Sequence, residues 1–268
     1  MDFAEYLKNS AKALDKEVGK ILEEQLKEAE KTDKKLVPLL KAFSKTCQGG
    51  KRIRGALIML GYEIAAHLPG VRAHLGGEII KVAAAYEIAH SAVLIHDDII
   101  DKSLTRRDKP SLYMGLGGNH YGISQAICLA DYGFFLAFKI IAKTKAAEVF
   151  SQVMMNTTWG QMLDIEKADP KVVMRLKTAC YTIAGPLQIG AILAGADEKS
   201  VRVLGEFGEN LGIAYQIKDD ILDEEVNSLE SAEKYINQAM KMLPEITKDQ
   251  EMSKLLQQMA DYLVQRTK

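Results

Sequence analysis

The chain has 268 residues, 47% of them hydrophobic and 26% charged, so it can bury a sizeable core as one large domain or two small ones. The net charge of −1 disfavours a nucleic-acid partner, because nucleic-acid-binding proteins usually carry a basic excess. Its three cysteines form no CxxC or Cys/His pattern, which indicates neither a disulfide framework nor a zinc site and favours a reducing, cytoplasmic setting.

The N-terminal residues show no secretory signal, since an acid follows Met1 and no apolar region comes after it. The longest apolar stretch, residues 126–142, is interrupted by Asp131 and falls short of membrane-spanning length. We therefore expect a soluble protein without a membrane span.

Apolar residues recur at helical spacing along most of the chain, as in the stripe formed by Val18, Ile21, Leu22 and Leu26. Alternation of period two, which would indicate strands, is almost absent. Glycine and proline separate most of the helical segments. The predicted helices cover residues 2–31, 36–43, 52–67, 77–101, 123–143, 146–166, 171–183, 187–194, 200–225, 228–242 and 248–267.

No flexible linker, low-complexity region or tandem repeat divides these helices. The sequence therefore predicts one all-α domain, a helical bundle over residues 1–268. The helices at 77–101 and 200–225 are apolar on more than one face, so we expect them near the centre.

The helix at 77–101 ends in three carboxylates. Asp97 and Asp101 share a face one turn apart, and Asp98 lies about 100° round the axis. Like charges this close repel unless a cation neutralises them, and a cluster of oxygen ligands favours Mg²⁺, which usually keeps positions for substrate phosphates. The alternative is a solvated acidic helix end.

A second cluster with the same spacing, Asp219, Asp220 and Asp223, ends the helix at 200–225. Two helices tipped with carboxylates can face each other across a cavity and hold several divalent ions. Their apolar runs would then line the cavity below. The ligand that fits has a phosphate-bearing head and a hydrocarbon tail.

Basic residues lie close to these helices. Lys51 and Arg54 share a face at a helix start, where free backbone N–H groups favour anions, and could clamp a diphosphate. Arg106 and Arg107 follow the first acidic cluster. In both places a solvated basic segment is the alternative.

Five other polar groups are candidates. His90 lies two turns before Asp97 on the same face, although a lone histidine on a helix is more often a core residue. Gln161 and Asp164 lie three residues apart on an otherwise apolar helix, and Lys177 next to Thr178 could contact a leaving diphosphate and a cationic intermediate. Each could equally be an ordinary part of a helix.

Five motifs in order, GGKRIRG, HSAVLIHDDIID followed by RR, GQMLDI, KTA and AYQIKDDILD, cover roughly residues 45–225. Together they resemble those of the trans-prenyl diphosphate synthases, the farnesyl and geranylgeranyl diphosphate synthase family. The resemblance implies an all-α fold of the isoprenoid synthase type with a central active-site cavity, usually in a homodimer. It also implies a Mg²⁺-dependent, head-to-tail condensation of an allylic diphosphate with isopentenyl diphosphate.

The resemblance assigns roles to individual residues. The implied Mg²⁺ ligands are Asp97, Asp101 and Asp219, and Asp98, Asp220 and Asp223 would support them. Gln161 and Asp164 would lie near the site without binding the metal. The implied isopentenyl diphosphate clamp is Lys51, Arg54, His90 and Arg107. The implied allylic diphosphate ligands are Arg106 and Lys177, and Thr178 and Gln216 face the allylic cation.

Two features bear on how far the resemblance extends. The family has a loop with Gly-Lys, Asp and Lys after its second acidic motif, whereas DDILDEE here runs directly into VNSLESAEKYINQAM. A loop near residues 224–228 is therefore deleted from the protein or missing from this sequence, and we favour the second reading because the late helices still resemble the family's. Arg266 and Lys268 resemble the family's basic C-terminus.

Product length follows from the turns below Asp97. Small residues there, Ala89, Ala92 and Val93, leave room for the hydrocarbon tail of a product. Tyr86 lies eleven residues before Asp97, about 16 Å along the helix, where it could close the end of the cavity. We therefore favour geranylgeranyl diphosphate, with farnesyl or longer polyprenyl diphosphates as alternatives.

Three other functions remain to be weighed. A low-activity regulatory subunit of a hetero-oligomeric prenyl synthase would lose metal ligands, and both acidic clusters are intact here. A terpene cyclase would not need GGKRIRG or a second such acidic motif. An all-α interaction module would have no reason to bury acids in its central helices.

Overall fold

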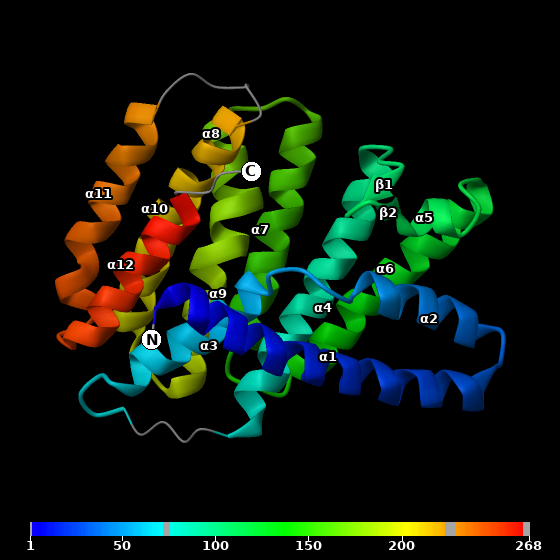
Figure 1. Ribbon diagram of the computed structural model, residues 1–268, viewed down its shortest axis with the longest axis horizontal. Coiled ribbons are helices and arrows are strands. Elements are labelled where there is room, and N and C mark those ends of the chain that lie inside the picture. Colours follow the sequence, from blue (N-terminus) through cyan, green and yellow to red (C-terminus); the bar gives the residue numbers. More distant parts are fainter. Residues whose placement is uncertain (1, 72–75, 223–228, 265–268) are drawn as a thin grey trace. The chain divides into compact units, whose positions relative to one another are not determined.

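The computed structural model describes residues 2–71, 76–222 and 229–264, and helices dominate it (Figure 1). The all-α prediction is therefore confirmed. The helices are α1 (Phe3–Thr32), α2 (Leu36–Thr46), α3 (Ile53–Ala66), α4 (Gly77–Ile100), α5 (Leu112–Gly115), α6 (His120–Ile141), α7 (Ala147–Ile165), α8 (Pro170–Val173), η1 (Met174–Ala184), α9 (Gly185–Ala194), α10 (Glu198–Leu222), α11 (Leu229–Ile246) and α12 (Gln250–Val264).

Several details differ from the sequence prediction. Residues 174–184 form the π-helix η1, in which the backbone N–H of Gly185 still reaches back five residues to the Cys180 carbonyl. Helix α11 continues two residues past Pro244, where a break was predicted, without the one hydrogen bond that the proline cannot donate. A short hairpin, β1 (Thr105–Arg106) with β2 (Lys109–Pro110), was not predicted.

The contacts within the chain group it into two compact units. Unit 1 comprises residues 1–10, 56–79 and 144–268, and unit 2 comprises residues 11–55 and 80–143. Each unit is described by itself. A single domain over residues 1–268 stays a prediction.

Unit 1 is built round α10. This helix packs against η1, α9, α11 and α12, and its Phe207 and Leu211 are fully buried. Helix α7 packs against η1 and α9. Glycine makes one of these approaches possible, since a Cβ at Gly212 of α10 would collide with the backbone of Ala179 in η1.

Unit 2 contains most of α4. Every residue from Val82 to Ala89 is buried, which agrees with the prediction that this helix is apolar on more than one face. Helix α6 crosses close to α2 and α4, because a Cβ at Gly133 would lie 2.7 Å from Phe43 and 3.2 Å from Ala92. The Tyr132 hydroxyl of α6 donates to Gln25 of α1 at 2.9 Å.

Among the residues that the structure describes, two helices, α4 and α6, are long and apolar enough to cross a membrane by length and composition alone. The apolar window of α4 is 61% buried, as in the core helices of water-soluble proteins, whereas that of α6 is 33% buried. The apolar stretch that we judged too short in the sequence thus lies in a helix of 22 residues. The lack of a membrane span stays a prediction.

Candidate active site

The first acidic cluster lies at the end of α4 and keeps helical geometry. The N–H of Asp101 donates to the Asp97 carbonyl at 2.9 Å, so these two residues stand one turn apart, as predicted. Asp97 is half-buried, Asp101 is exposed, and Asp98 is turned inward with 2% of its surface exposed.

Arg106 returns to this cluster through the β1–β2 hairpin. The two turn residues, Arg107 and Asp108, have φ angles of 53° and 60°, the left-handed pair that a tight two-residue hairpin requires. Arg106 Nε then donates to Asp98 Oδ1 at 2.7 Å, and its Nη2 lies 3.4 Å from Asp97 Oδ2. The arginine assigned to the allylic diphosphate therefore binds the aspartates in this structure.

Burial raises the pKa of Asp98, the charges of Asp97 and Asp101 add to the rise, and the Arg106 guanidinium acts against it. The carboxylates of this cluster supply only oxygen donors, which fits a hard divalent ion such as Mg²⁺. Among the described residues, no group of three or more His, Cys, Asp or Glu side chains is arranged to hold a metal ion. The carboxylates thus suit Mg²⁺ chemically, and the three metal ligands assigned from the sequence stay predictions.

The second acidic cluster is only partly described. Asp219 is half-buried near the end of α10, Asp220 lies in the same helix with its side chain outside the described part, and Asp223 lies outside the described residues. The loop expected near 224–228 and the basic residues Arg266 and Lys268 also lie outside them. Asp219 belongs to unit 1 and the first cluster to unit 2, so their opposition across a central cavity stays a prediction.

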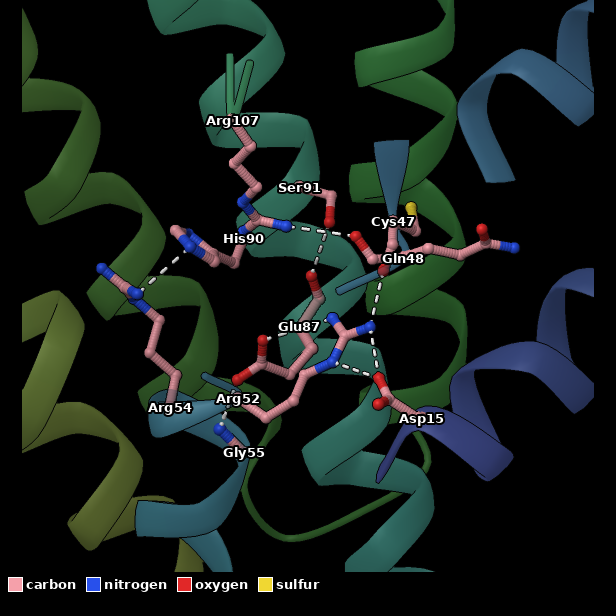
Figure 2. Close-up of polar contacts among 10 residues, drawn as sticks. All are labelled: Asp15, Cys47, Gln48, Arg52, Arg54, Gly55, Glu87, His90, Ser91 and Arg107. Atoms are coloured by element: carbon pink, nitrogen blue, oxygen red, sulfur yellow. Dashed lines mark hydrogen bonds and ion pairs between the residues drawn. The ribbon is translucent and has the colours of Figure 1, made fainter. Parts of the chain in front are cut away.

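Three of the four predicted clamp residues gather beside the loop between α2 and α3 (Figure 2). Arg54 Nη1 lies 3.2 Å from His90 Nε2, and Arg107 Nη1 donates to the Gln48 carbonyl of this loop at 3.1 Å. Lys51, the fourth, is exposed on the same loop. The structure therefore brings together Arg54, His90 and Arg107, which span 53 positions of the chain.

The electrostatic setting of His90 is cationic. Burial holds the pKa of its imidazole well below the usual value, and the charges of Arg54, Arg107, Arg106 and Arg52 lower it further. His90 is therefore neutral at neutral pH. A diphosphate placed beside His90 would lie in this cationic setting, next to a neutral imidazole that can offer an N–H donor.

The remaining polar candidates lie in unit 1. Lys177 Nζ on η1 and Asp164 Oδ2 on α7 form an ion pair at 2.6 Å, which the sequence analysis did not anticipate although both residues stood out as polar on apolar helices. Gln161, Thr178 and Gln216 are half-buried on α7, η1 and α10. Since π-helical segments often occur at functional sites, the position of Lys177 and Thr178 on η1 is consistent with a role in binding.

The residues proposed to set product length are mostly enclosed. Tyr86, Ala89 and Ala92 are fully buried in α4, and Val93 is half-buried. Ala92 faces Gly133 of α6. Their role in chain length stays a prediction.

Two residues that the sequence analysis passed over, Asp15 and Glu87, bind the buried Arg52 beside the clamp. Glu87 was visible in the sequence as a single acid within the apolar run AAAYEIAH. Asp15 gave no such signal, because it lies on a helix with many charged residues.

A model of the polyprenyl synthetase family matches residues 37–237. The chain belongs to the polyprenyl synthetase family. This membership confirms the resemblance on which the roles of the five motifs were based, since the matched residues include all five.

Named relatives in this family include two archaeal enzymes. The geranylfarnesyl diphosphate synthase of Aeropyrum pernix is 35% identical over 193 residues, which cover 65% of this chain and 57% of that protein. The geranylgeranyl diphosphate synthase of Sulfolobus acidocaldarius is 31% identical over 193 residues, or 65% of this chain and 54% of that protein. The chain thus spans a little over half the length of these relatives.

Solved structures of other proteins share the fold. A geranylgeranyl pyrophosphate synthase from Corynebacterium glutamicum, complexed with isoprenyl diphosphate and magnesium, superimposes with a TM-score of 0.85 over 100% of both chains at 19% identity. A geranyltranstransferase from Thermotoga maritima gives a TM-score of 0.70 at 28% identity, over 91% of this chain and 97% of that one. The isoprenoid synthase type of fold is therefore confirmed.

Proposed function

We propose that the protein is a trans-prenyl diphosphate synthase that condenses an allylic diphosphate with isopentenyl diphosphate, head to tail. The observation that carries the proposal is the arrangement along α4, where a cationic cluster surrounds His90 and the acidic cluster begins at Asp97. Seven residues of α-helix separate the two by about 10 Å. That spacing suits two neighbouring diphosphates, one bound by cationic side chains and one bound through metal ions.

Each set of side chains has a task in this reaction. Lys51, Arg54, His90 and Arg107 would hold isopentenyl diphosphate by charge and hydrogen bonds, with its double bond directed at the allylic carbon. Arg106 and Lys177 would hold the allylic diphosphate as its C–O bond breaks and negative charge develops on it. The double bond attacks the resulting allylic cation, and the proton then lost passes to the released diphosphate, so the chain need not supply a nucleophile.

We assign the metal to Mg²⁺, held by Asp97 and Asp101 from the first cluster and Asp219 from the second. Asp98, Asp220 and Asp223 would support these ligands. Bound Mg²⁺ would neutralise charge on the departing diphosphate. The all-oxygen donor set supports the assignment, as does the magnesium in the Corynebacterium relative.

For the product we favour geranylgeranyl diphosphate, with farnesyl or longer polyprenyl diphosphates as alternatives. The small side chains of Ala89 and Ala92 on α4 support a product longer than farnesyl diphosphate, with Tyr86 as the proposed floor. The relatives named above make geranylgeranyl and geranylfarnesyl diphosphates according to their names, which supports the same range. A low-activity regulatory subunit is the rival function.

We further propose a cytoplasmic homodimer without a membrane span or a nucleic-acid partner. Helix α6 exposes large apolar side chains along one face, at Ile127, Phe135 and Phe138, and α7 exposes Met155 and Trp159. Exposed apolar faces of this kind mark interaction surfaces, and a second copy of the chain would cover them.

The deciding experiment incubates the purified protein with Mg²⁺, labelled isopentenyl diphosphate and, separately, dimethylallyl, geranyl and farnesyl diphosphates. We expect label in a prenyl product whose length is read by chromatography, and no product in EDTA. No incorporation with any starter, by a protein that is folded by circular dichroism, would contradict the proposal and favour the regulatory subunit.

A further inference from the structure

Arg52 lies in the GGKRIRG motif between two proposed substrate ligands, yet its side chain points into the protein (Figure 2). Only 5% of Arg52 is exposed. Its Nε and Nη2 atoms both lie 2.8 Å from Asp15 Oδ1, and Nη2 also donates to the Cys47 carbonyl at 2.7 Å. Arg52 thus joins α1 to Cys47, the residue that follows α2.

Glu87 of α4 completes this network from the other side. Its Oε2 atom lies 3.6 Å from Arg52 Nη1, and its Oε1 atom accepts a hydrogen bond from the backbone N–H of Gly55 at 2.7 Å. That N–H belongs to the first turn of α3, where backbone donors have no partner inside the helix. A Cβ at Gly55 would lie 2.8 Å from Leu14 and 3.1 Å from Glu87, so the close approach depends on glycine.

The backbone of the loop between α2 and α3 is unusual. Gly49, Gly50 and Arg52 have φ angles of 75°, 95° and 52°, and the left-handed region is costly for a residue with a Cβ such as Arg52. The bonds from Asp15 and Glu87 to the guanidinium therefore hold a backbone conformation that the arginine would not adopt by itself.

The path of this loop decides where the proposed clamp lies. Lys51 is the residue before Arg52, and Arg54 is the second residue of α3, the helix that Glu87 caps. Arg107 packs directly on the loop, because a Cβ at Gly50 would lie 2.7 Å from its Nη2 atom. His90 follows Glu87 on α4 by three residues, so the helix that fixes the loop also supplies the histidine.

We propose that Arg52 and Glu87 are positioning residues that hold the clamp of Lys51, Arg54, His90 and Arg107 in shape for isopentenyl diphosphate without touching it. The proposal rests on the proposed function for the identity of that substrate. Two carboxylates, Asp15 and Glu87, balance the inward charge of Arg52. Lys51, the other cation of the loop, is exposed.

The test uses variants that remove parts of the network. Glu87→Gln keeps an oxygen for the Gly55 N–H but removes the charge, whereas Glu87→Ala removes both. Arg52→Lys keeps the positive charge but loses the planar guanidinium that reaches several acceptors at once. We expect KM for isopentenyl diphosphate to rise about tenfold or more in Glu87→Ala and Arg52→Lys, and less in Glu87→Gln. KM for the allylic diphosphate should stay within about twofold of the wild-type value in all three variants. The matched control is Arg202→Lys, whose partner Glu206 is exposed on α10, and both KM values should stay unchanged.

Calorimetric titration of isopentenyl diphosphate in EDTA measures the clamp directly, since without a metal the acidic cluster repels a diphosphate. Asp15→Asn serves as a milder change, because the Asp15 side chain is 52% exposed and asparagine keeps an oxygen that can accept from Arg52. Weaker binding by Asp15→Asn than by Arg202→Lys supports the proposal. The proposal would be overturned by equal affinities in all variants, or by KM values that rise together for both substrates. If the wild type does not bind isopentenyl diphosphate at all, the proposed function itself is contradicted.

Discussion

At the scale of single residues, the neutral state of His90 has a consequence for stability. Its pKa in the folded protein lies well below that of the unfolded chain, because the imidazole is buried among arginines. The unfolded chain therefore takes up the proton first, and stability present above about pH 6.5 is lost as the pH falls, with a slope of at most about 1.4 kcal/mol per pH unit. Asp98 has the opposite effect on stability. Its pKa is raised in the folded protein, so its contribution is lost as the pH rises.

We predict that the free energy of unfolding, from urea titrations, falls more between about pH 7 and pH 5 for the wild type than for His90→Asn. Comparing the two proteins cancels the contributions of Asp98 and other titrating groups. Parallel curves over this range would show that His90 is not a buried neutral imidazole.

Arg106 and the acidic cluster form a second testable pair. Arg106→Met removes the hydrogen bond at 2.7 Å from the buried Asp98, so it should destabilise the protein in EDTA by about 1–3 kcal/mol. Mg²⁺ should raise the melting temperature more for this variant than for the wild type, because the guanidinium no longer competes for Asp97 and Asp98. A Mg²⁺ response equal to that of the wild type would contradict the assignment of these carboxylates to the metal.

The sequence allowed some of these residues to be found and not others. The acidic cluster is local, so helical spacing alone placed Asp97 and Asp101 on one face. The pairing of Arg54 with His90, 36 positions apart, depends on the tertiary fold, and only the resemblance to a family suggested it. The inward turn of Arg52 could not be read from the sequence, because it depends on a left-handed backbone and on carboxylates from two other helices.

At the scale of elements, periodicity predicted long helices to within a residue or two, as for α4 and α7, because their length averages over local irregularity. It missed the β1–β2 hairpin, whose strands of two residues are too short for any alternation to show. It also missed η1. Residues 174–184 carry no pattern that distinguishes a π-helix from an α-helix, and in the structure both α7 and α10 pack against them.

The contact between α7 and η1 can be tested at Gly160. A Cβ there would lie 2.5 Å from the Lys177 backbone nitrogen, and a backbone atom cannot move aside as a flexible side chain can. We expect Gly160→Ala to destabilise the protein by about 1–3 kcal/mol in urea unfolding and to raise KM for the allylic diphosphate, because the ion pair between Lys177 and Asp164 spans the same contact.

The control for this change is Gly19→Ala in α1, where nothing lies within 4 Å of the added carbon. A glycine in a helix interior costs about 0.5–1 kcal/mol relative to alanine, so this variant should be slightly more stable than the wild type. If Gly160→Ala behaved like Gly19→Ala, α7 and η1 would not pack as closely as described.

At the scale of the whole molecule, the exposed apolar face of α6 has two possible environments, a membrane or another protein surface. Its most exposed member is Phe135, at 72%, with Phe138 further along the same face. Helix α6 also carries Asp131 and Lys139, which are costly to place in the hydrocarbon core of a bilayer. A partner surface can accommodate both the apolar and the charged residues, and in the proposed homodimer that surface belongs to a second copy of the chain.

Phe135→Glu tests this conclusion. A carboxylate at the centre of an apolar interface should weaken dimer association by about 100-fold, or roughly 2.7 kcal/mol, and light scattering after size exclusion should then give the mass of one chain. The side chain makes little contact within its own chain, so far-UV circular dichroism should not change. Leu104→Glu, at a residue of similar exposure outside α6 and α7, should leave the dimer intact. A wild type that is monomeric at every concentration, or a Phe135→Glu variant that remains dimeric, would show that another surface or none joins the subunits.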